Sequence, residues 1–162
     1  MHRLFLTLSC LALLLGAATL ASCDKTPMNG DLDGMWRLTE MHSKPTADAP
    51  TYSLQADHLR AQRQRIFWNF QLRLLSIQNH DSLANSETNE TVARFEHSGN
   101  RLHVTHTYIH HRAEDILITD PTTTQLEHVG IRGCSSSFEV KCLTSKRMVL
   151  CSERDSLVFR KY

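Results

Sequence analysis

This 162-residue chain is poor in three kinds of feature, and each shortage excludes a class of function. Its charges balance, with 18 Lys and Arg against 17 Asp and Glu, whereas nucleic-acid-binding domains carry a clustered basic surplus. It has no long apolar run after residue 22, so no later segment is predicted to cross a membrane as a helix. It also lacks Cys-x-x-Cys pairs and a Gly-x-Ser-x-Gly motif, the patterns of zinc sites and of hydrolase nucleophiles. We therefore predict no nucleic acid partner, no metal, no cofactor and no catalytic activity.

The first 22 residues have the three parts of a secretory signal peptide. His2 and Arg3 form a short basic start, an apolar stretch follows, and the small residues Ala21 and Ser22 end it. The sequence LASC, which ends at Cys23, matches the bacterial lipobox, in which the Cys is acylated and becomes the first residue of the mature chain. Acyl chains on Cys23 would hold the domain at membrane lipid, because each buried CH₂ contributes about 0.8 kcal/mol.

This start of the chain predicts both the domain boundaries and the location. Residues 1–22 are predicted to be the signal peptide, residues 23–31 the lipidated Cys with a short flexible tether, and residues 32–162 a single folded domain. We expect a lipid-anchored protein in the cell envelope of a Gram-negative bacterium, at the outer membrane and facing the periplasm or the cell surface.

After the tether, apolar and polar residues alternate with the period of β-strands. Strands are predicted over 35–41, 65–77, 91–98, 101–111, 115–119, 138–144, 148–151 and 156–162, with one or two helical turns over 123–130. Thr124 and Glu127 have the spacing of a capping box, and Gly130 can end that segment. Because closure removes exposed strand edges, we predict an all-β fold, an antiparallel up-and-down β-barrel of about eight strands with short helices in its connections.

The segment 91–111 gives the clearest local prediction, a β-hairpin. Gly99 and Asn100 both tolerate the positive φ that a two-residue hairpin turn requires. A turn at these residues pairs Phe95 with Val104, and it places the apolar residues of both strands on one face of the hairpin.

The first and the last predicted strands each carry a motif. Gly34-Met35-Trp36 opens the first strand, and LVFRKY closes the chain with Arg160 on the last strand. This order resembles the lipocalin and wider calycin pattern, in particular the lipocalin-like lipoproteins of some anaerobic Gram-negative bacteria, over residues 32–162. The resemblance implies that Trp36 plugs the closed end of the barrel and that Arg160 packs over it as a cation–π pair.

The interior of such a barrel either fills with side chains or encloses one small ligand. The residues predicted to face inward are mainly apolar with a few polar insertions, a composition that suits a small hydrophobic or amphipathic ligand: Trp68, Phe70, Leu72, Phe95, His97, Val104, His106, Tyr108, His110 and Phe138. The leading hypothesis is therefore carriage of a small lipophilic ligand. The alternative is a filled barrel that binds protein or glycan through its outer face and the long connections 43–62 and 120–137.

Two further features concern covalent chemistry. If a turn centres on residues 146–147, Cys142 lies opposite Cys151 and a disulfide can join them, which leaves Cys134 over. Asp81-Ser82-Leu83 and Asp155-Ser156-Leu157 fit a pattern that some anaerobic Gram-negative bacteria O-glycosylate.

The ten histidines suggest metal binding, but strand geometry argues against it. His106 and His110 would share a face about 13 Å apart, too far to bind one ion without another element.

Overall fold

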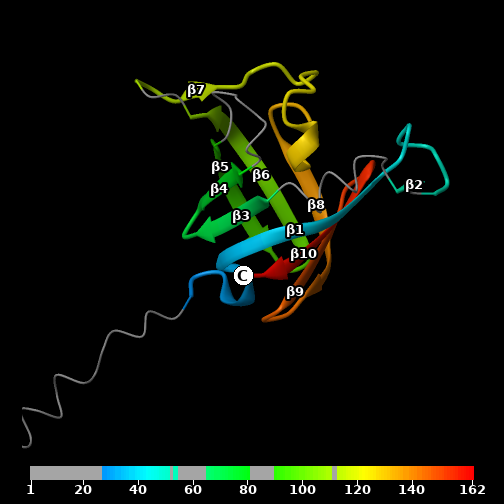
Figure 1. Cartoon of the computed structure of the whole chain (residues 1–162), viewed down its shortest axis with the longest axis horizontal. Coiled ribbons are helices and arrows are strands. Elements are labelled where there is room, and N and C mark those ends of the chain that lie inside the picture. The colour runs from blue at the N-terminus through cyan, green and yellow to red at the C-terminus, as the bar shows by residue number, and fades with distance from the viewer. Residues whose placement is uncertain (1–26, 52, 55–64, 81–89, 111–112) are drawn as a thin grey trace, which may run out of the picture.

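The computed structural model describes residues 27–51, 53–54, 65–80, 90–110 and 113–162. Within them, eight strands form one closed antiparallel sheet: β1 (Gly34–Ser43), β3 (Ile66–Gln71), β4 (Leu74–Asn79), β5 (Glu90–Ser98), β6 (Arg101–Ile109), β8 (Ser136–Leu143), β9 (Arg147–Cys151) and β10 (Asp155–Lys161). The last strand pairs with the first, from Trp36 opposite Lys161 to Ser43 opposite Asp155, and this pairing closes the barrel (Figure 1). The predicted antiparallel barrel is confirmed.

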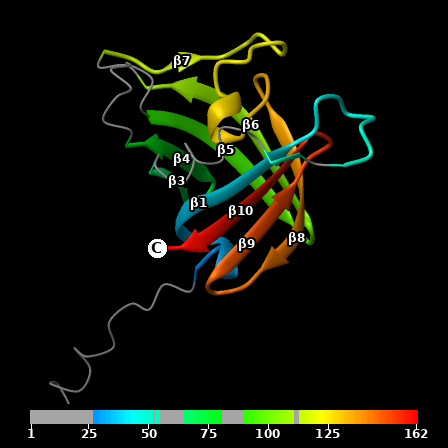
Figure 2. The same ribbon diagram turned by 45° about the vertical axis from the view of Figure 1, so that its right-hand side comes forward.

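Among the described residues, four short elements lie outside the barrel wall. They are η1 (Gly30–Leu32), β2 (Ser53–Leu54), β7 (Ile116–Leu117) and η2 (Glu127–Val129). η1 lies beside the C-terminus at one end of the barrel, and η2 lies at the opposite end (Figures 1 and 2). In the described part of the chain, no helix is both long enough and apolar enough to span a membrane.

The predicted helical segment near residue 127 exists as the single 3₁₀ turn η2, and Gly130 ends it with a φ of +92°. The predicted capping box is wrong, because no side chain caps this turn. Instead, the Thr124 carbonyl oxygen accepts a hydrogen bond from the Glu127 N–H. A main-chain hydrogen bond therefore satisfies the Glu127 N–H group that the Thr124 side chain was expected to cap.

The hairpin with Gly99 and Asn100 at its tip is confirmed, and Phe95 pairs with Val104 as predicted. Beyond Thr105 the predicted register fails, because His106 is an extra residue in β6, a bulge with a φ of +46°. Each bulge reverses the faces of the residues that follow it. As a result Thr107 is fully buried, whereas His106 is exposed.

The single long strand predicted over 65–77 is also wrong. The chain reverses at Leu72 and Arg73, so the segment forms a hairpin of β3 and β4, with Ile66 opposite Asn79. Leu72 adopts a φ of +57° and is 57% exposed. The Asn29 side-chain amide donates to the Leu72 carbonyl oxygen over 2.8 Å, and the Phe95 N–H donates to the Arg73 carbonyl oxygen over 3.1 Å. Contacts from distant segments thus hold a turn that has no Gly or Pro.

Candidate functional site

The structure divides the ten predicted ligand-pocket residues into three groups. Five of them are buried in the hydrophobic core: Trp68, Phe70, Phe95, Val104 and Phe138. Three are exposed on turns or on the outer wall, contrary to the prediction: Leu72, His106 and His110. His97 and Tyr108 are half-buried. Thr107, fully buried in the place of His106, is the inward residue that the unrecognised bulge concealed.

The five buried residues do not line an empty calyx at their level of the barrel; they fill it. The Trp68 ring centroid lies 5.9 Å from that of Phe138 and 5.1 Å from that of Phe159, and the Phe70 and Phe95 centroids are 5.1 Å apart. The Trp68–Phe138 and Phe70–Phe95 pairs are edge-to-face and the Trp68–Phe159 pair is tilted, and ring contacts at such separations are favourable. All of these rings are at most 3% exposed, so this part of the interior is occupied by side chains.

Both ends of this core are covered by short elements. At the lower end, η1 brings in Leu32, which is fully buried, and its carbonyl oxygen accepts a hydrogen bond of 2.8 Å from the Trp36 indole N–H. At the upper end, the η2 segment, residues 126–131, contributes buried Leu126, Val129 and Ile131 to the same core. The Val129 carbonyl oxygen accepts the Trp68 indole N–H over 3.1 Å.

The cation that covers Trp36 is Lys161, not Arg160. Lys161 lies opposite Trp36 in the β1–β10 ladder, and its Nζ is 4.9 Å from the centroid of the Trp36 ring. The same Nζ donates to the Asp31 carbonyl oxygen over 2.8 Å. Arg160 is exposed on the outer face. The signal was present in the sequence, because alternation places Lys161 on the same face as Leu157 and Phe159.

The predicted Cys142–Cys151 disulfide is wrong. The β8–β9 turn centres on residues 145–146, one residue earlier than expected, and Lys141 adds a bulge in β8, so Cys142 lies opposite Val149 and Cys151 opposite Glu139. Cys134, Cys142 and Cys151 are all free thiols. Ser156 lies in β10 between buried Asp155 and Leu157, so the folded strand does not expose this tripeptide. Cys23 and Ser82 lie outside the described residues.

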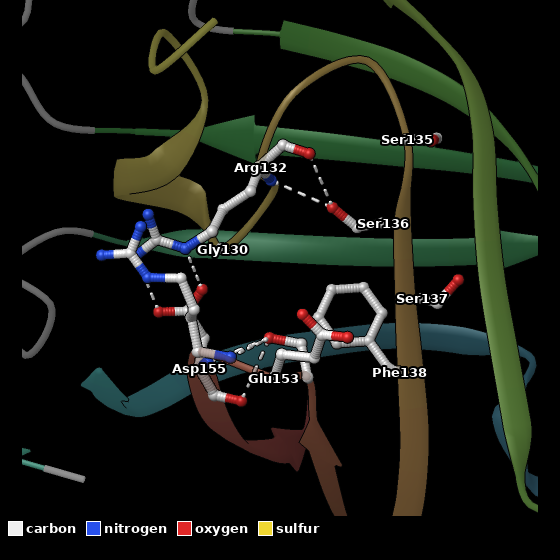
Figure 3. Close-up of a pocket in the computed structure, with 10 residues that line it drawn as sticks. Gly130, Arg132, Ser135, Ser136, Ser137, Phe138, Glu153 and Asp155 are labelled. Atoms are coloured by element: carbon white, nitrogen blue, oxygen red, sulfur yellow. Dashed lines mark hydrogen bonds and ion pairs between the residues drawn. The ribbon is translucent and has the colours of Figure 1, made fainter. Parts of the chain in front are cut away.

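An open pocket of about 300 Å³ lies in the side of the barrel, where β8 separates from the β9–β10 turn. We call it the lateral pocket (Figure 3). Residues 135–138 form one wall, residues 152–155 form the other, and Arg132 lies above them. Four of its lining residues are serines, and its two cationic side chains are matched by two carboxylates.

A wider depression of about 900 Å³ continues from this pocket along the outer face of β6, β8 and β9. It shares Ser137, Phe138, Ser152 and Glu153 with the lateral pocket, so we name the two together the lateral groove. Its charged residues are balanced as well, and Lys141 and Glu139 form an ion pair of 2.7 Å within it. His103 Nδ1 lies 2.7 Å from the Ser137 hydroxyl. The groove therefore offers many hydrogen-bonding groups, and its charged side chains are the four basic Arg101, Arg132, Lys141 and Arg154 and the three acidic Glu139, Glu153 and Asp155.

Arg132 joins the η2 segment to the barrel through a set of charged contacts that we call the latch. Its guanidinium donates to both carboxylate oxygens of Asp155 and to Glu127. Asp155 is 1% exposed and also accepts a hydrogen bond from the Ser43 hydroxyl. The hydrogen bond to Asp155 raises the pKa of Arg132, and the guanidinium stays charged. Burial of His128 on η2 lowers the pKa of its imidazole.

In the described residues, no group of three or more His, Cys, Asp and Glu side chains is arranged to hold a metal ion. The histidine-rich strand places its side chains apart: His110 forms an ion pair of 2.8 Å with Asp115, and His106 lies 3.0 Å from the Thr105 hydroxyl.

A sequence model of the lipocalin-like domain matches residues 18–162. The chain belongs to this lipocalin-like family. Its barrel is similar to that of a lipocalin-like protein from Bacteroides uniformis, with a TM-score of 0.52 and 18% identity over 82% of this chain and 100% of that one. It is also similar to an uncharacterized protein from Bacteroides eggerthii, with a TM-score of 0.50 and 17% identity over 80% and 98% of the two chains. No curated protein matches the sequence. At these identities, the likeness of this lipocalin-like protein to solved structures shows the fold alone.

Proposed function

We propose that this lipocalin-like protein is a non-catalytic, lipid-anchored binding module of the cell envelope and that it takes its ligand in the lateral groove. The observation that carries the proposal is the contrast between two parts of the barrel. The interior around Trp68 is filled with aromatic side chains, whereas the groove at β8 is open and lined with hydroxyl, amide and charged groups. This is the second of the two hypotheses drawn from the sequence.

The lipobox at Cys23 supports a fixed orientation at the membrane. The described chain begins at Pro27, close to η1 and the end of the barrel that holds the C-terminus. Four residues reach at most about 14 Å, so acylated Cys23 would keep this end near membrane lipid. The lateral pocket lies toward the opposite end, where β8 begins and β9 turns into β10. The binding face is thus presented away from the membrane.

Two variants of the mature chain test where the ligand binds. Ser135 is exposed in the lateral pocket, and Ser145 is exposed in the β8–β9 turn outside the groove. A photo-crosslinking p-benzoylphenylalanine is placed at either position, and the lipidated protein is irradiated in cells of its own host. We expect a defined adduct from position 135 and none from position 145.

The rival hypothesis, a lipophile in the interior, is measured on the same chain. Native mass spectrometry of the chain carrying Cys23→Ser, exported to the periplasm of the host, shows whether a lipophilic mass is retained. A retained lipophile, together with no adduct at position 135, would overturn the groove proposal in favour of carriage in the barrel.

A further inference from the structure

Strand β8 changes its neighbour half-way along its length. From Ser136 to Glu139 it pairs with β6, and its pairing with β9 begins only at Glu139, opposite Cys151. The chain leaves β9 at this level, because Ser152 donates its N–H to the Asp155 carbonyl oxygen over 2.8 Å and the β9–β10 turn begins. Among the described strands, none therefore pairs with the β9-side edge of β8 at residues 136–138.

The hydrogen-bond pattern identifies the main-chain groups on this open edge. The Val140 N–H donates to the Asn100 carbonyl oxygen over 2.7 Å, in register with the β6–β8 ladder. In antiparallel pairs, successive residues direct their main-chain groups alternately to one neighbour and to the other. Phe138 and Ser136 therefore face β6, and Ser137 faces away from it. The N–H and C=O of Ser137 point into the lateral pocket.

We propose that the lateral groove accepts an extended segment of a partner polypeptide, which adds to β8 as a short strand and pairs with Ser137. The inference rests on the proposed function and names its ligand class. Open strand edges are the sites where extended peptides add to a sheet, with main-chain hydrogen bonds supplying affinity. Because β1 pairs with β10, the barrel has no open edge at that seam. The edge of β8 before Glu139 is a place where the barrel wall does present main-chain groups to an added strand.

Charge and shape restrict the occupant. Four charged side chains of the groove already have a partner, because Arg132 is bound to Asp155 and Lys141 to Glu139, so these four are not available as counter-charges for a ligand. The Ser137–Glu139 part of β8 and the β9–β10 turn face each other across the pocket, as Figure 3 shows for Ser137, Phe138 and Glu153. Phe138, the aromatic residue of the lining, is only 3% exposed, so its ring is not available to stack on a sugar. These features favour peptide over glycan.

The probe is a phage-displayed library of random 12-residue peptides, selected on the mature chain with Cys23→Ser. Selected peptides are then titrated against three proteins: that chain, and its Ser137→Ala and Ser137→Pro variants. Proline removes the N–H that faces the pocket and leaves the bonds to β6 intact, which is where a sheet tolerates it. We expect selected peptides to bind the Ser137→Pro variant about tenfold more weakly than the Ser137→Ala variant, which is the effect of one main-chain hydrogen bond.

A second measurement does not depend on the folding of the proline variant. Amide hydrogen exchange on the Cys23→Ser chain is expected to slow at Ser137 when a selected peptide saturates the protein. Peptides that bind without protecting Ser137, or a library that yields no binder, overturn the inference.

The two proposals fail in different ways. If peptides are not selected but neutral oligosaccharides on an array bind, and Ser135→Trp blocks them while Ser145→Trp does not, the groove still binds and only the ligand class is wrong. If position 135 gives no crosslink, the proposed function itself is wrong.

Discussion

The Lys161 side chain makes two contacts at the closed end of the barrel. Its ammonium group lies over the Trp36 ring and donates to the Asp31 carbonyl oxygen, so it fastens η1 to the last strand. We predict that Lys161→Met lowers the free energy of unfolding by about 0.5–2 kcal/mol, the range of a cation–π contact. Arg160→Met, one residue away on the outer face, is expected to stay within about 0.5 kcal/mol of the parent. Urea unfolding followed by tryptophan fluorescence measures both, and equal losses would contradict the assignment.

Asp155 is the residue on which the latch depends. It is 1% exposed and accepts hydrogen bonds from Arg132 and Ser43, whereas the other carboxylate partner of Arg132, Glu127, is 36% exposed. Removing one partner of a buried ion pair costs about 3–5 kcal/mol because the remaining charge is left uncompensated, and an exposed pair is worth about 0–1 kcal/mol. We therefore expect Asp155→Asn to destabilise the protein far more than Glu127→Gln in chemical unfolding. A loss of similar size in both variants would show that the latch does not discriminate between its two carboxylates.

The η2 segment covers the upper end of the barrel. Gly130 ends it with a φ of +92°, and a Cβ at this position would lie 2.7 Å from a methyl group of Leu157, which is fully buried. Gly99 has a φ of +58° but open space around the same position. Gly99→Ala is expected to cost about 1–2 kcal/mol from the backbone alone. Gly130→Ala should cost about 1–3 kcal/mol more from overpacking, as measured by thermal unfolding with near-ultraviolet circular dichroism, which reports the packing around Trp68. If the two variants lose the same stability, η2 does not pack as tightly as described.

The strand elements also show which parts of this fold a sequence can predict. The hairpin around Gly99 and Asn100 was predictable, because both its turn chemistry and its alternation are local. The turn at Leu72 was not, because two residues without special turn propensity are held there by Asn29 and Phe95 from elsewhere in the chain. The bulge at His106 was concealed for a similar reason: an uninterrupted alternation of residue types gives no sign of one added residue.

These errors explain why the candidate site in the structure differs from the one predicted from the sequence. One bulge in β6 put His106 and His110 on the outer wall instead of inside the barrel, and the turn and bulge of β8–β9 moved Cys142 away from Cys151. The lateral groove could not be read from the sequence at all. It arises because β8 pairs with β6 along one half and with β9 along the other, which is a property of the register and not of any motif.

At the scale of the whole molecule, the fold and the site are linked through a filled core. Aromatic rings from β3, β5, β8 and β10 occupy the centre of the barrel, and η1 and η2 cover its ends. In the function that we propose, the ligand therefore binds at the wall of the barrel. The membership of the lipocalin-like family and the side-placed groove are compatible, because a barrel of eight strands is narrow enough for side chains alone to fill it.

The seam between β1 and β10 has a consequence for how the protein is made. The partners of Trp36 to Ser43 lie in β10, which follows all the other strands in the sequence, so the barrel cannot close until β10 has been synthesised. Such long-range pairing is slow to form. A chain cut before Asp155 would keep two open sheet edges, on β1 and on β9, and open edges promote aggregation. Incomplete copies of this protein would therefore be unclosed sheets with their aromatic cores uncovered.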